Sequence, residues 1–246
     1  MLNRPNDHGA GKPAQSKVIG IMQPYFFPYF EQFRLIAACD VWVVFDTAQY
    51  TKKSWMSRNR ILNRDKGTSY LSVPVQHTGR NTPIAQALID TRKDWRADIL
   101  NKLRVYEAEA PEYATVRELV AESIAGDHRT IASLNTALLR RVCSYLQIDT
   151  PVLVTSTLLI DLPTHCEPGE WALHISKYLG ATEYRNAAGG KALFDPALYA
   201  SHGIKLSFHE AKPRTYPTGR FNFVPDMSVI DWMMWNKRET LKSWLL

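Results

Sequence analysis

The sequence predicts an α/β fold, with a Rossmann-like, mostly parallel sheet and a helical segment inserted in the middle of the chain. Two apolar runs, Val18–Met22 and Val41–Phe45, enclose the stretch Tyr29–Cys39, whose apolar residues gather on one side of a helix. The second run shows no alternation of polar and apolar residues, which is typical of a strand covered on both faces. A strand, a helix and a second strand in this order form a βαβ unit, from which parallel sheets are built.

The rest of the chain continues with helices and strands. From Asp94 to Leu146 the apolar residues repeat at helical spacing. Helices are predicted at Asp94–Ala108, Pro111–Ile124, Thr130–Leu146, Glu167–Leu179, Asp195–Ser201 and Ser228–Trp235, the last with Ser228 as its N-cap. Further strands are predicted at Ser69–Val75, Pro151–Ser156, Glu183–Arg185 and Ile204–His209, whereas Ile84–Ile89 fits a strand or a short connection.

The chain of 246 residues is predicted to have a disordered tail at residues 1–16 and a single α/β domain at residues 17–246. The tail is polar, contains Gly and Pro, and lacks the apolar centre of a signal peptide. No apolar run approaches the roughly 18 residues that a membrane-spanning helix needs. The three cysteines, Cys39, Cys143 and Cys166, are odd in number and lack metal-binding spacing. A reduced, cytoplasmic setting is therefore expected.

The charge balance favours small anionic partners. The formal net charge is +6, which suits phosphates and other anions. The sequence shows no dense run of Lys and Arg and no zinc-finger or RNA-binding signature, so nucleic acid is not an expected partner. Most of the seven tryptophans are expected in the core, with ligand stacking as the less favoured alternative.

The densest group of polar side chains lies between Gln23 and Arg60. The stretch Gln23–Pro28 contains two prolines and leaves the first strand at the edge where ligands bind in open α/β sheets. The second strand delivers Asp46 to the same edge. Candidate catalytic residues are Asp46 and Lys53, and candidate substrate-binding residues are Gln23, Pro24, Tyr25, Gln49, Tyr50, Trp55, Arg58, Asn59 and Arg60. The cations suit phosphate or carboxylate oxygens, and the alternative is a solvated basic turn that leads into a helix.

These residues also resemble the opening motif of the WbqC-like family. The motif covers Ile21–Pro28, Asp46, Gln49–Tyr50, Trp55 and Arg58–Arg60. The distal part of the chain is similar too, at Ser156, Gly180–Tyr184, Gly190, Gly203–Ile204, Tyr216, Phe223–Pro225 and Ser228–Asp231. On this resemblance, Gly190 and Tyr216 join the candidate substrate-binding residues.

The resemblance implies a role in O-antigen and other bacterial surface-polysaccharide synthesis, and some members of the family are described as glycine or aminoacyl transferases. We therefore expect a transferase that moves an acyl or aminoacyl group onto an amino group of a sugar nucleotide. Its partner would be an anionic small molecule, either the sugar nucleotide or an activated acyl donor. Asp46 would accept or hold a proton, while Lys53, Arg58 and Arg60 would hold anionic groups. Thr47 stands where the family has a second aspartate, which weakens the case for a divalent metal there, and no cofactor is identified.

Two other functions stay open. The protein could be a non-catalytic protein that binds a sugar nucleotide or a partner, because the sequence shows no complete triad, dyad or metal set. The order of strand, turn, helix, Asp and strand is also similar to Rossmann-type nucleotidyltransferases such as pantothenate synthetases. Their turn carries a His-x-Gly-His signature, and this turn has no histidine.

Other signals are weaker. Cys166 with His165 or His174 would suit acyl transfer through a thioester, but neighbours in sequence rarely form a catalytic dyad. Gly189–Lys191 lacks the spacing of a phosphate-binding loop. The histidines at 77, 202 and 209 have no metal-binding spacing.

Overall fold

The computed structural model describes residues 16–65, 67–77, 79–163 and 165–245. Its centre is a five-stranded sheet in the order β5-β2-β1-β6-β7, in which every neighbouring pair is parallel. The strands are β1 (Val18–Met22), β2 (Val41–Val44), β5 (Val152–Val154), β6 (Glu183–Ala187) and β7 (Lys205–His209). The predicted α/β fold with a mostly parallel sheet is confirmed. The predicted tail lies outside the described residues apart from Ser16.

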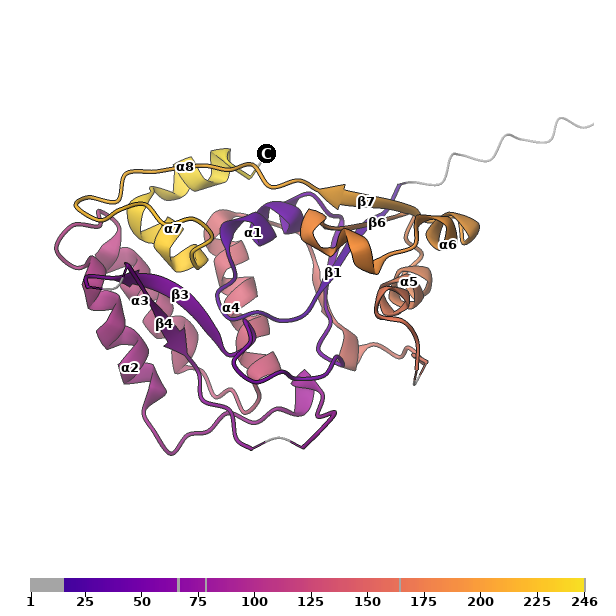
Figure 1. Ribbon diagram of the computed structural model, residues 1–246, viewed down its shortest axis with the longest axis horizontal. Helices are drawn as coiled ribbons and strands as arrows, with labels where there is room; N and C mark the ends of the chain where they lie inside the picture. Colours follow the sequence, from indigo (N-terminus) through magenta and orange to yellow (C-terminus); the bar gives the residue numbers. More distant parts are fainter. Residues whose placement is uncertain (1–15, 66, 78, 164, 246) are drawn as a thin grey trace, which may run out of the picture.

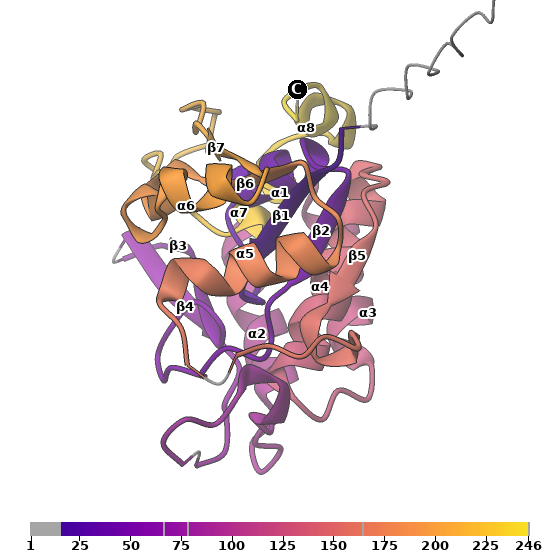
Figure 2. The same ribbon diagram turned by 90° about the vertical axis from the view of Figure 1, so that its right-hand side faces the viewer.

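Helices cover both faces of the sheet (Figure 1). On one face lie α5 (Pro168–Tyr178) and α6 (Pro196–Ser201), which Figure 2 shows in front of the strands. On the other face lie α1 (Phe30–Ala37) and α4 (Ile131–Leu146). Adjacent residues of each strand enter different cores, so that Val43 packs with the α5 side while Trp42 and Val44 pack with the α1 side. This two-sided burial explains the unbroken apolar run of β2.

One close contact explains a glycine in the central strand. Gly20 of β1 pairs in register with Trp42 of β2. A Cβ added at Gly20 would lie 2.6 Å from the Trp42 ring, which is too close for any real side chain. Gly20 therefore makes room for the largest fully buried side chain of the α1-side core.

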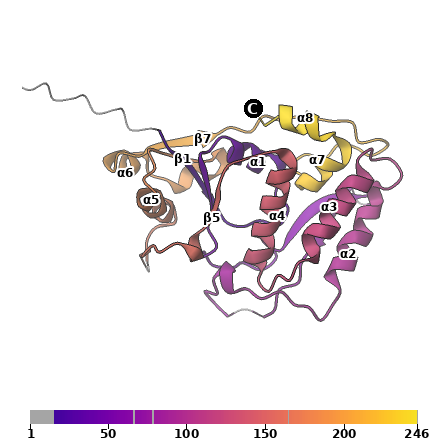
Figure 3. The same ribbon diagram turned by 180° about the vertical axis from the view of Figure 1, so that it is seen from behind.

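The helical segment in the middle of the chain lies on the same side of the sheet as α1. It contains α2 (Trp95–Lys102), α3 (Tyr113–Ala125) and α4, which Figure 3 shows side by side from behind. Two C-terminal helices, α7 (Val229–Trp235) and α8 (Arg238–Ser243), pack onto α3 and α4. The prediction of α7 with Ser228 as N-cap agrees with the Ser228 hydroxyl accepting from the Ile230 amide. Helix α8 was not predicted, and Ile84–Gln86 forms a 3₁₀ turn.

A second, two-stranded sheet stands apart from the parallel one. β3 (Arg58–Asn63) and β4 (Gly67–Ser72) pair antiparallel, and they lie beside α2 and α7 (Figure 1). The sequence predicts no strand at Arg58–Arg60, but these residues open β3. A polar start conceals the strand, since the pattern becomes apolar only at Ile61 and Leu62.

The strand order also fixes where a ligand would bind. From β1 the chain passes through α1 to β2 on one side, whereas β6 lies against β1 on the other side. Connections therefore leave the carboxyl ends of β1 and β6 in opposite directions. In open α/β sheets, ligands bind outside the carboxyl ends of the strands at such a switch point.

Candidate functional site

The loop Gln23–Pro28 continues β1 at the switch point, and two buried asparagines hold it. The Asn135 side-chain amide of α4 donates to the Pro24 carbonyl at 2.8 Å. The Asn59 amide of β3 donates to the carbonyls of Phe26 at 3.1 Å and Phe27 at 2.7 Å. The loop carbonyls thus gain partners without regular secondary structure, which buried backbone groups require.

Two further contacts complete this support. The Phe26 amide donates to the Trp55 carbonyl at 2.8 Å, and the Ser228 hydroxyl donates to the Phe27 carbonyl at 2.8 Å. Phe27 itself has a φ of 39°, a left-handed conformation that bulky residues rarely adopt. A strained residue that several contacts hold in place is typical of functional loops, and the loop is therefore rigid.

Gln23 and Tyr25 follow β1 directly and are half-buried, while Pro24 between them is buried. Burial raises the pKa of the Tyr25 phenol. Tyr29 is the N-cap residue of α1 without a side-chain capping bond, and burial, followed by the nearby Tyr25, raises its pKa as well. Both phenols therefore stay protonated near neutral pH and can donate hydrogen bonds.

Two polar residues that the sequence did not single out for binding end the strands beyond β1. Asn186 lies near the end of β6, and His209 ends β7 opposite Ala187. Burial first, and then the charge of Arg34, lowers the His209 pKa. Its Nε2 lies 3.9 Å from a Glu31 carboxylate oxygen, which is too far for a hydrogen bond. Sheet order is the signal that would have identified them, because it places these strand ends beside β1.

Gly190 lies in the 3₁₀ turn Ala188–Leu193 that follows β6. A Cβ at Gly190 would lie 3.2 Å from the Asn186 amide nitrogen, so the turn folds back onto the end of the strand. The structure thus brings Gly190 to the same edge of the sheet as the Gln23–Pro28 loop.

Asp46 follows β2 at this edge, as predicted. Its side chain is only 2% exposed, and both carboxylate oxygens accept hydrogen bonds from Ser156. The Ser156 amide donates at 2.9 Å and the hydroxyl donates at 2.5 Å. Ser156 is exposed and belongs to the 3₁₀ turn Thr155–Thr157 after β5, so its hydroxyl connects the buried carboxylate to the surface. A proton-accepting role of Asp46 stays a prediction.

The residues after Asp46 differ in exposure. Gln49 is exposed and forms a β-bridge with Pro83, whereas Tyr50 is buried and its amide donates to the Thr82 carbonyl at 2.8 Å. Lys53 is exposed in a turn with a φ of 54°. The Lys53 ammonium group is therefore on the surface, and its proposed role in catalysis stays a prediction.

Trp55, Arg58 and Arg60 form a group with Tyr70 on one face of the β3–β4 hairpin. The Arg58 guanidinium lies over the Tyr70 ring, 4.3 Å from its centre, and the Arg60 guanidinium lies 5.8 Å from the centre of the Trp55 ring. The two rings are 6.4 Å apart. Arg60 also donates to the Asp226 carbonyl at 3.0 Å. Asn59 points to the opposite, buried face of the hairpin.

Tyr216 lies in a different environment. It is buried, and its hydroxyl donates to one oxygen of Asp231 at 2.5 Å, while the Tyr106 hydroxyl donates to the other at 2.6 Å. Burial raises the pKa of both phenols and of Asp231. A substrate contact of Tyr216 stays a prediction, since the hydroxyl already has a partner.

Other features of the described residues add little to this site. No group of three or more His, Cys, Asp or Glu side chains among them could hold a metal ion. Two surface hollows of about 320 Å³ and 510 Å³ lie elsewhere, near the end of α4 and between α2 and α3. Burial, followed by the charges of Glu170 and Glu167, raises the Cys166 pKa, so its thiol is protonated at neutral pH. None of the helices in the described part of the chain could cross a membrane, being too short or too polar.

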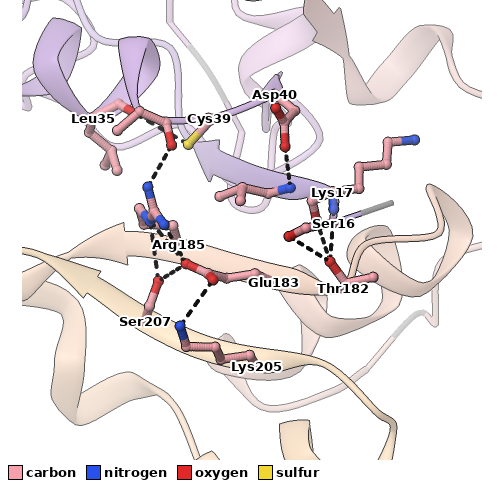
Figure 4. Close-up of polar contacts among 12 residues, drawn as sticks. Ser16, Lys17, Leu35, Cys39, Asp40, Thr182, Glu183, Arg185, Lys205 and Ser207 are labelled. Carbon is pink, nitrogen blue, oxygen red and sulfur yellow. Dashed lines mark hydrogen bonds and ion pairs between the residues drawn. The ribbon is translucent and has the colours of Figure 1, made fainter. Parts of the chain in front are cut away.

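The opposite, amino edge of the sheet carries a polar network of its own (Figure 4). Arg185 of β6 donates to the Glu183 carboxylate at 2.6 Å and to the Ala38 carbonyl at the end of α1, also at 2.6 Å. The Ser207 hydroxyl donates to Glu183 at 2.6 Å, and Lys205 lies 3.3 Å from the same carboxylate. These contacts tie β6, β7 and α1 together, so they serve the fold.

A model of the WbqC-like protein family matches residues 23–243, from the rigid loop to α8. The chain belongs to the WbqC-like protein family. A curated relative from Mycobacterium tuberculosis, named Uncharacterized protein Rv1507c, is 29% identical over 219 residues, which cover 87% of this chain and 92% of the relative. No solved structure matches the chain.

Within this WbqC-like protein the structure therefore joins two groups of predicted residues. Gln23, Pro24 and Tyr25 follow β1, and Asp46 follows the neighbouring strand β2, in which Val44 pairs with Met22. Trp55 and Asn59 bond directly to the loop that contains Gln23.

Proposed function

We propose that this protein is a transferase of bacterial surface-polysaccharide synthesis that acts in the cytoplasm at the carboxyl edge of its sheet. It moves an acyl or aminoacyl group from an activated thioester or ester onto an amino group of a sugar nucleotide. In this reaction the amine nitrogen attacks the carbonyl carbon and forms a C–N bond, while the C–S or C–O bond to the carrier breaks. The amine proton ends on the thiol or alcohol that leaves.

One arrangement supports this proposal most directly. The rigid Gln23–Pro28 loop and the Asp46–Ser156 pair lie at the carboxyl ends of neighbouring strands, beside the switch point of a doubly wound sheet. The chain belongs to the WbqC-like family, and the transferase is the activity that the resemblance described under Sequence analysis implies. Fold alone does not determine chemistry, so the proposal depends on these side chains.

The proposed proton path uses Asp46 and Ser156. The Ser156 hydroxyl accepts the amine proton and passes its own hydrogen to the Asp46 carboxylate. The proton then moves back through the Ser156 hydroxyl to the leaving thiol or alcohol. The 2.5 Å hydrogen bond between the two groups is suited to this transfer. Gln23 and Tyr25 orient the acceptor, and Lys53, Arg58 and Arg60 hold the anionic groups.

The test is product formation from sugar nucleotides that carry a free amino group, with a panel of acyl and aminoacyl donors, followed by mass spectrometry. We expect Asp46→Asn to lower the rate about 100-fold or more. Ser156→Ala should lower it as well, although the Ser156 amide still bonds to Asp46. The matched control is Asp40→Asn, because Asp40 is an exposed carboxylate that binds the Val18 amide at the amino edge. Unchanged rates in Asp46→Asn and Arg58→Ala would overturn the assignment.

A second function has one observation in its favour. Both oxygens of Asp46 are already bonded to Ser156, which also suits a purely structural carboxylate in a protein that binds a sugar nucleotide without turnover. Tight binding of a sugar nucleotide without product from any donor would select this function. Release of pyrophosphate from a nucleoside triphosphate would select nucleotidyl transfer instead.

A further inference from the structure

The outward face of the β3–β4 hairpin carries an exposed aromatic pair. Trp55, just before β3, is 44% exposed, and Tyr70 of β4 is 40% exposed. The ring planes are tilted by 39°. Of the described residues, the only other aromatic side chain that is exposed is Tyr178 on α5, on the far side of the sheet. Each ring leaves about two-fifths of its area open to solvent, and exposed rings that lie side by side in this way can mark a binding surface.

Two arginines share this face because of the strand register. Arg60 lies opposite Tyr70, and Arg58 lies opposite Ser72. Side chains alternate along a strand, so these residues point outward, while Asn59, Ile61 and Leu71 point inward and are buried. The hairpin thus has an apolar inner face, and its outer face carries the two arginines and Tyr70, whereas Leu62 farther along the same face is buried.

The guanidinium groups retain much of their hydrogen-bonding capacity. Within the described part of the chain, neither Arg58 nor Arg60 forms an ion pair with a carboxylate, and Arg58 donates no hydrogen bond. The Arg58 guanidinium contacts the Tyr70 ring, 4.3 Å from its centre, and this contact does not use its N–H groups as hydrogen-bond donors to the chain. Among the described residues no partner binds the buried Nε of Arg60, and its terminal nitrogen donates only to the Asp226 carbonyl.

The hairpin also holds a fixed position relative to the candidate site. Its inner face bonds to the Gln23–Pro28 loop through Asn59, and the Trp55 carbonyl accepts from the Phe26 amide. On the other side, the Lys102 ammonium of α2 donates to the Tyr70 carbonyl at 2.8 Å. A ligand on the outer face would therefore be positioned relative to the carboxyl edge of the sheet.

We infer that the outer face of the β3–β4 hairpin binds a nucleoside diphosphate group, with the base stacked on Trp55 and the phosphates held by Arg58 and Arg60. An exposed aromatic ring provides a stacking surface for any base, and stacked arginines provide paired donors for phosphate oxygens. The inference rests on the proposed function, since it identifies which part of a sugar nucleotide would bind there. The sugar would then extend toward the rigid loop.

A mononucleotide fits this face better than a single-stranded nucleic acid does. Strand-binding proteins place several aromatic rings along a basic groove, so that successive bases stack. Here one exposed pair of rings stands with two arginines, and Lys52 and Lys53 of the preceding turn are the nearest exposed lysines in sequence. This arrangement suits one base and one pair of phosphates.

The experiment measures binding of UDP and ADP to the full chain by calorimetry and by quenching of tryptophan fluorescence. We expect Trp55→Ala to weaken binding roughly 5- to 100-fold, while Trp55→Phe should retain most of it. Arg58→Ala should weaken binding about tenfold or more, and Arg58→Lys should restore it only in part. Trp55→Phe should also remove the quenching that the base causes.

Matched controls carry the same changes elsewhere. Tyr178→Ala removes an equally exposed ring on α5, and Arg141→Ala removes an exposed arginine that pairs with Glu122. Neither should change the affinity. Circular dichroism of each variant would verify that the hairpin variants remain folded.

Four outcomes would overturn the inference. Equal nucleotide affinity in all variants would place the site elsewhere, and inorganic phosphate competing as well as UDP would leave an anion site without base stacking. Binding of an oligonucleotide, but not of UDP or ADP, would also overturn it. Product formation without nucleotide binding to this face would overturn the inference and leave the proposed transfer intact. Binding to this face without product would support the inference and count against the transfer.

Discussion

Arg185 and Arg58 are two half-buried arginines on strands, and they use their guanidinium groups in opposite ways. Arg185 of β6 donates to Glu183, to Ser207 and to the last turn of α1 (Figure 4). Arg58 of β3 stacks on Tyr70 and donates to none of the other described residues. The first arginine joins three elements of the fold, whereas the second contacts an aromatic ring and keeps its guanidinium N–H groups available.

This difference teaches how to separate structural from ligand-binding polar groups in a protein with few other indications. Where hydrogen bonds are already made within the chain, substitution should lower stability. Where a group is fixed in place but unpartnered, substitution should change binding and leave stability nearly unchanged.

The largest effect is expected for Arg185→Ala. It removes both Arg185 hydrogen bonds to the Glu183 carboxylate, whose side chain is 10% exposed, and the bond to the Ala38 carbonyl, while Ser207 and Lys205 still contact the carboxylate; we expect a loss of about 3 kcal/mol in the free energy of unfolding. Arg58→Ala should change it by less than about 0.5 kcal/mol. Urea unfolding of both variants and of Arg141→Ala measures this. A loss in Arg58→Ala as large as that in Arg185→Ala would break the comparison.

The stability that the Arg185–Glu183 pair contributes should depend on pH. Burial alone would raise the Glu183 pKa, but hydrogen bonds from Ser207 and Arg185 and the charge of Arg185 hold it below 4.5. A carboxyl group whose pKa is lowered by folding stabilises the folded state at any pH above its pKa in the unfolded chain. This stabilisation is lost as the pH falls through the pKa of the folded state. The difference in unfolding free energy between wild type and Arg185→Ala should therefore become smaller below about pH 4.5.

Asn59 sharpens the comparison within one strand, since it is the inward neighbour of Arg58. Asn59→Ala removes two hydrogen bonds to the Gln23–Pro28 loop, so the Phe26 carbonyl loses its side-chain donor and the Phe27 carbonyl keeps only Ser228. We expect a loss of about 2 kcal/mol in unfolding free energy, together with weaker nucleotide binding because the loop loosens. Urea unfolding and calorimetry measure the two effects, with the exposed Asn222→Ala as control. A change in neither quantity would show that the loop does not depend on Asn59.

Much of the fold could be predicted because its signals are local. The apolar runs of β1 and β2 and the helical periodicity of α4 each lie within one short segment. Strand β3 was missed because it begins with two arginines and an asparagine, and α8 because it is short and polar. Neither segment shows the periodicity by which elements are recognised.

The site was predictable only in outline. The position of Asp46 after a strand follows from sequence, but its partner Ser156 lies 110 residues away, and Asn135 lies 111 residues from Pro24. The positions of Asn186 and His209 depend on the strand order, which brings β6 against β1. Contacts of this kind come from tertiary packing, and no local pattern encodes them.

Tyr216→Phe tests whether a buried hydroxyl with a partner also contacts substrate. The variant removes one of two phenol hydrogen bonds to Asp231 and keeps the ring, so we expect a loss of about 1.5 kcal/mol in unfolding free energy. Nucleotide binding should stay unchanged. The exposed Tyr178→Phe is the control for stability. Weaker nucleotide binding at unchanged stability would instead support the substrate contact that the family resemblance implies.

His209 gives the smallest effect, because its unpartnered Nε2 lies between groups of both charges. Arg34 and Glu31 of α1, Arg185 of β6 and Lys212 of the following segment all act on it, after burial, and its pKa is lowered from 6.5. The imidazole of His209 therefore binds a proton more tightly in the unfolded chain than in the folded one. Its contribution to stability is complete above about pH 6.5, and it is lost as the pH falls through the lower pKa of the folded state. His209→Gln should remove less than about 1 kcal/mol of the stability difference between pH 8 and pH 5, measured by urea unfolding. A pH dependence of stability that His209→Gln leaves unchanged would show that His209 does not contribute to it.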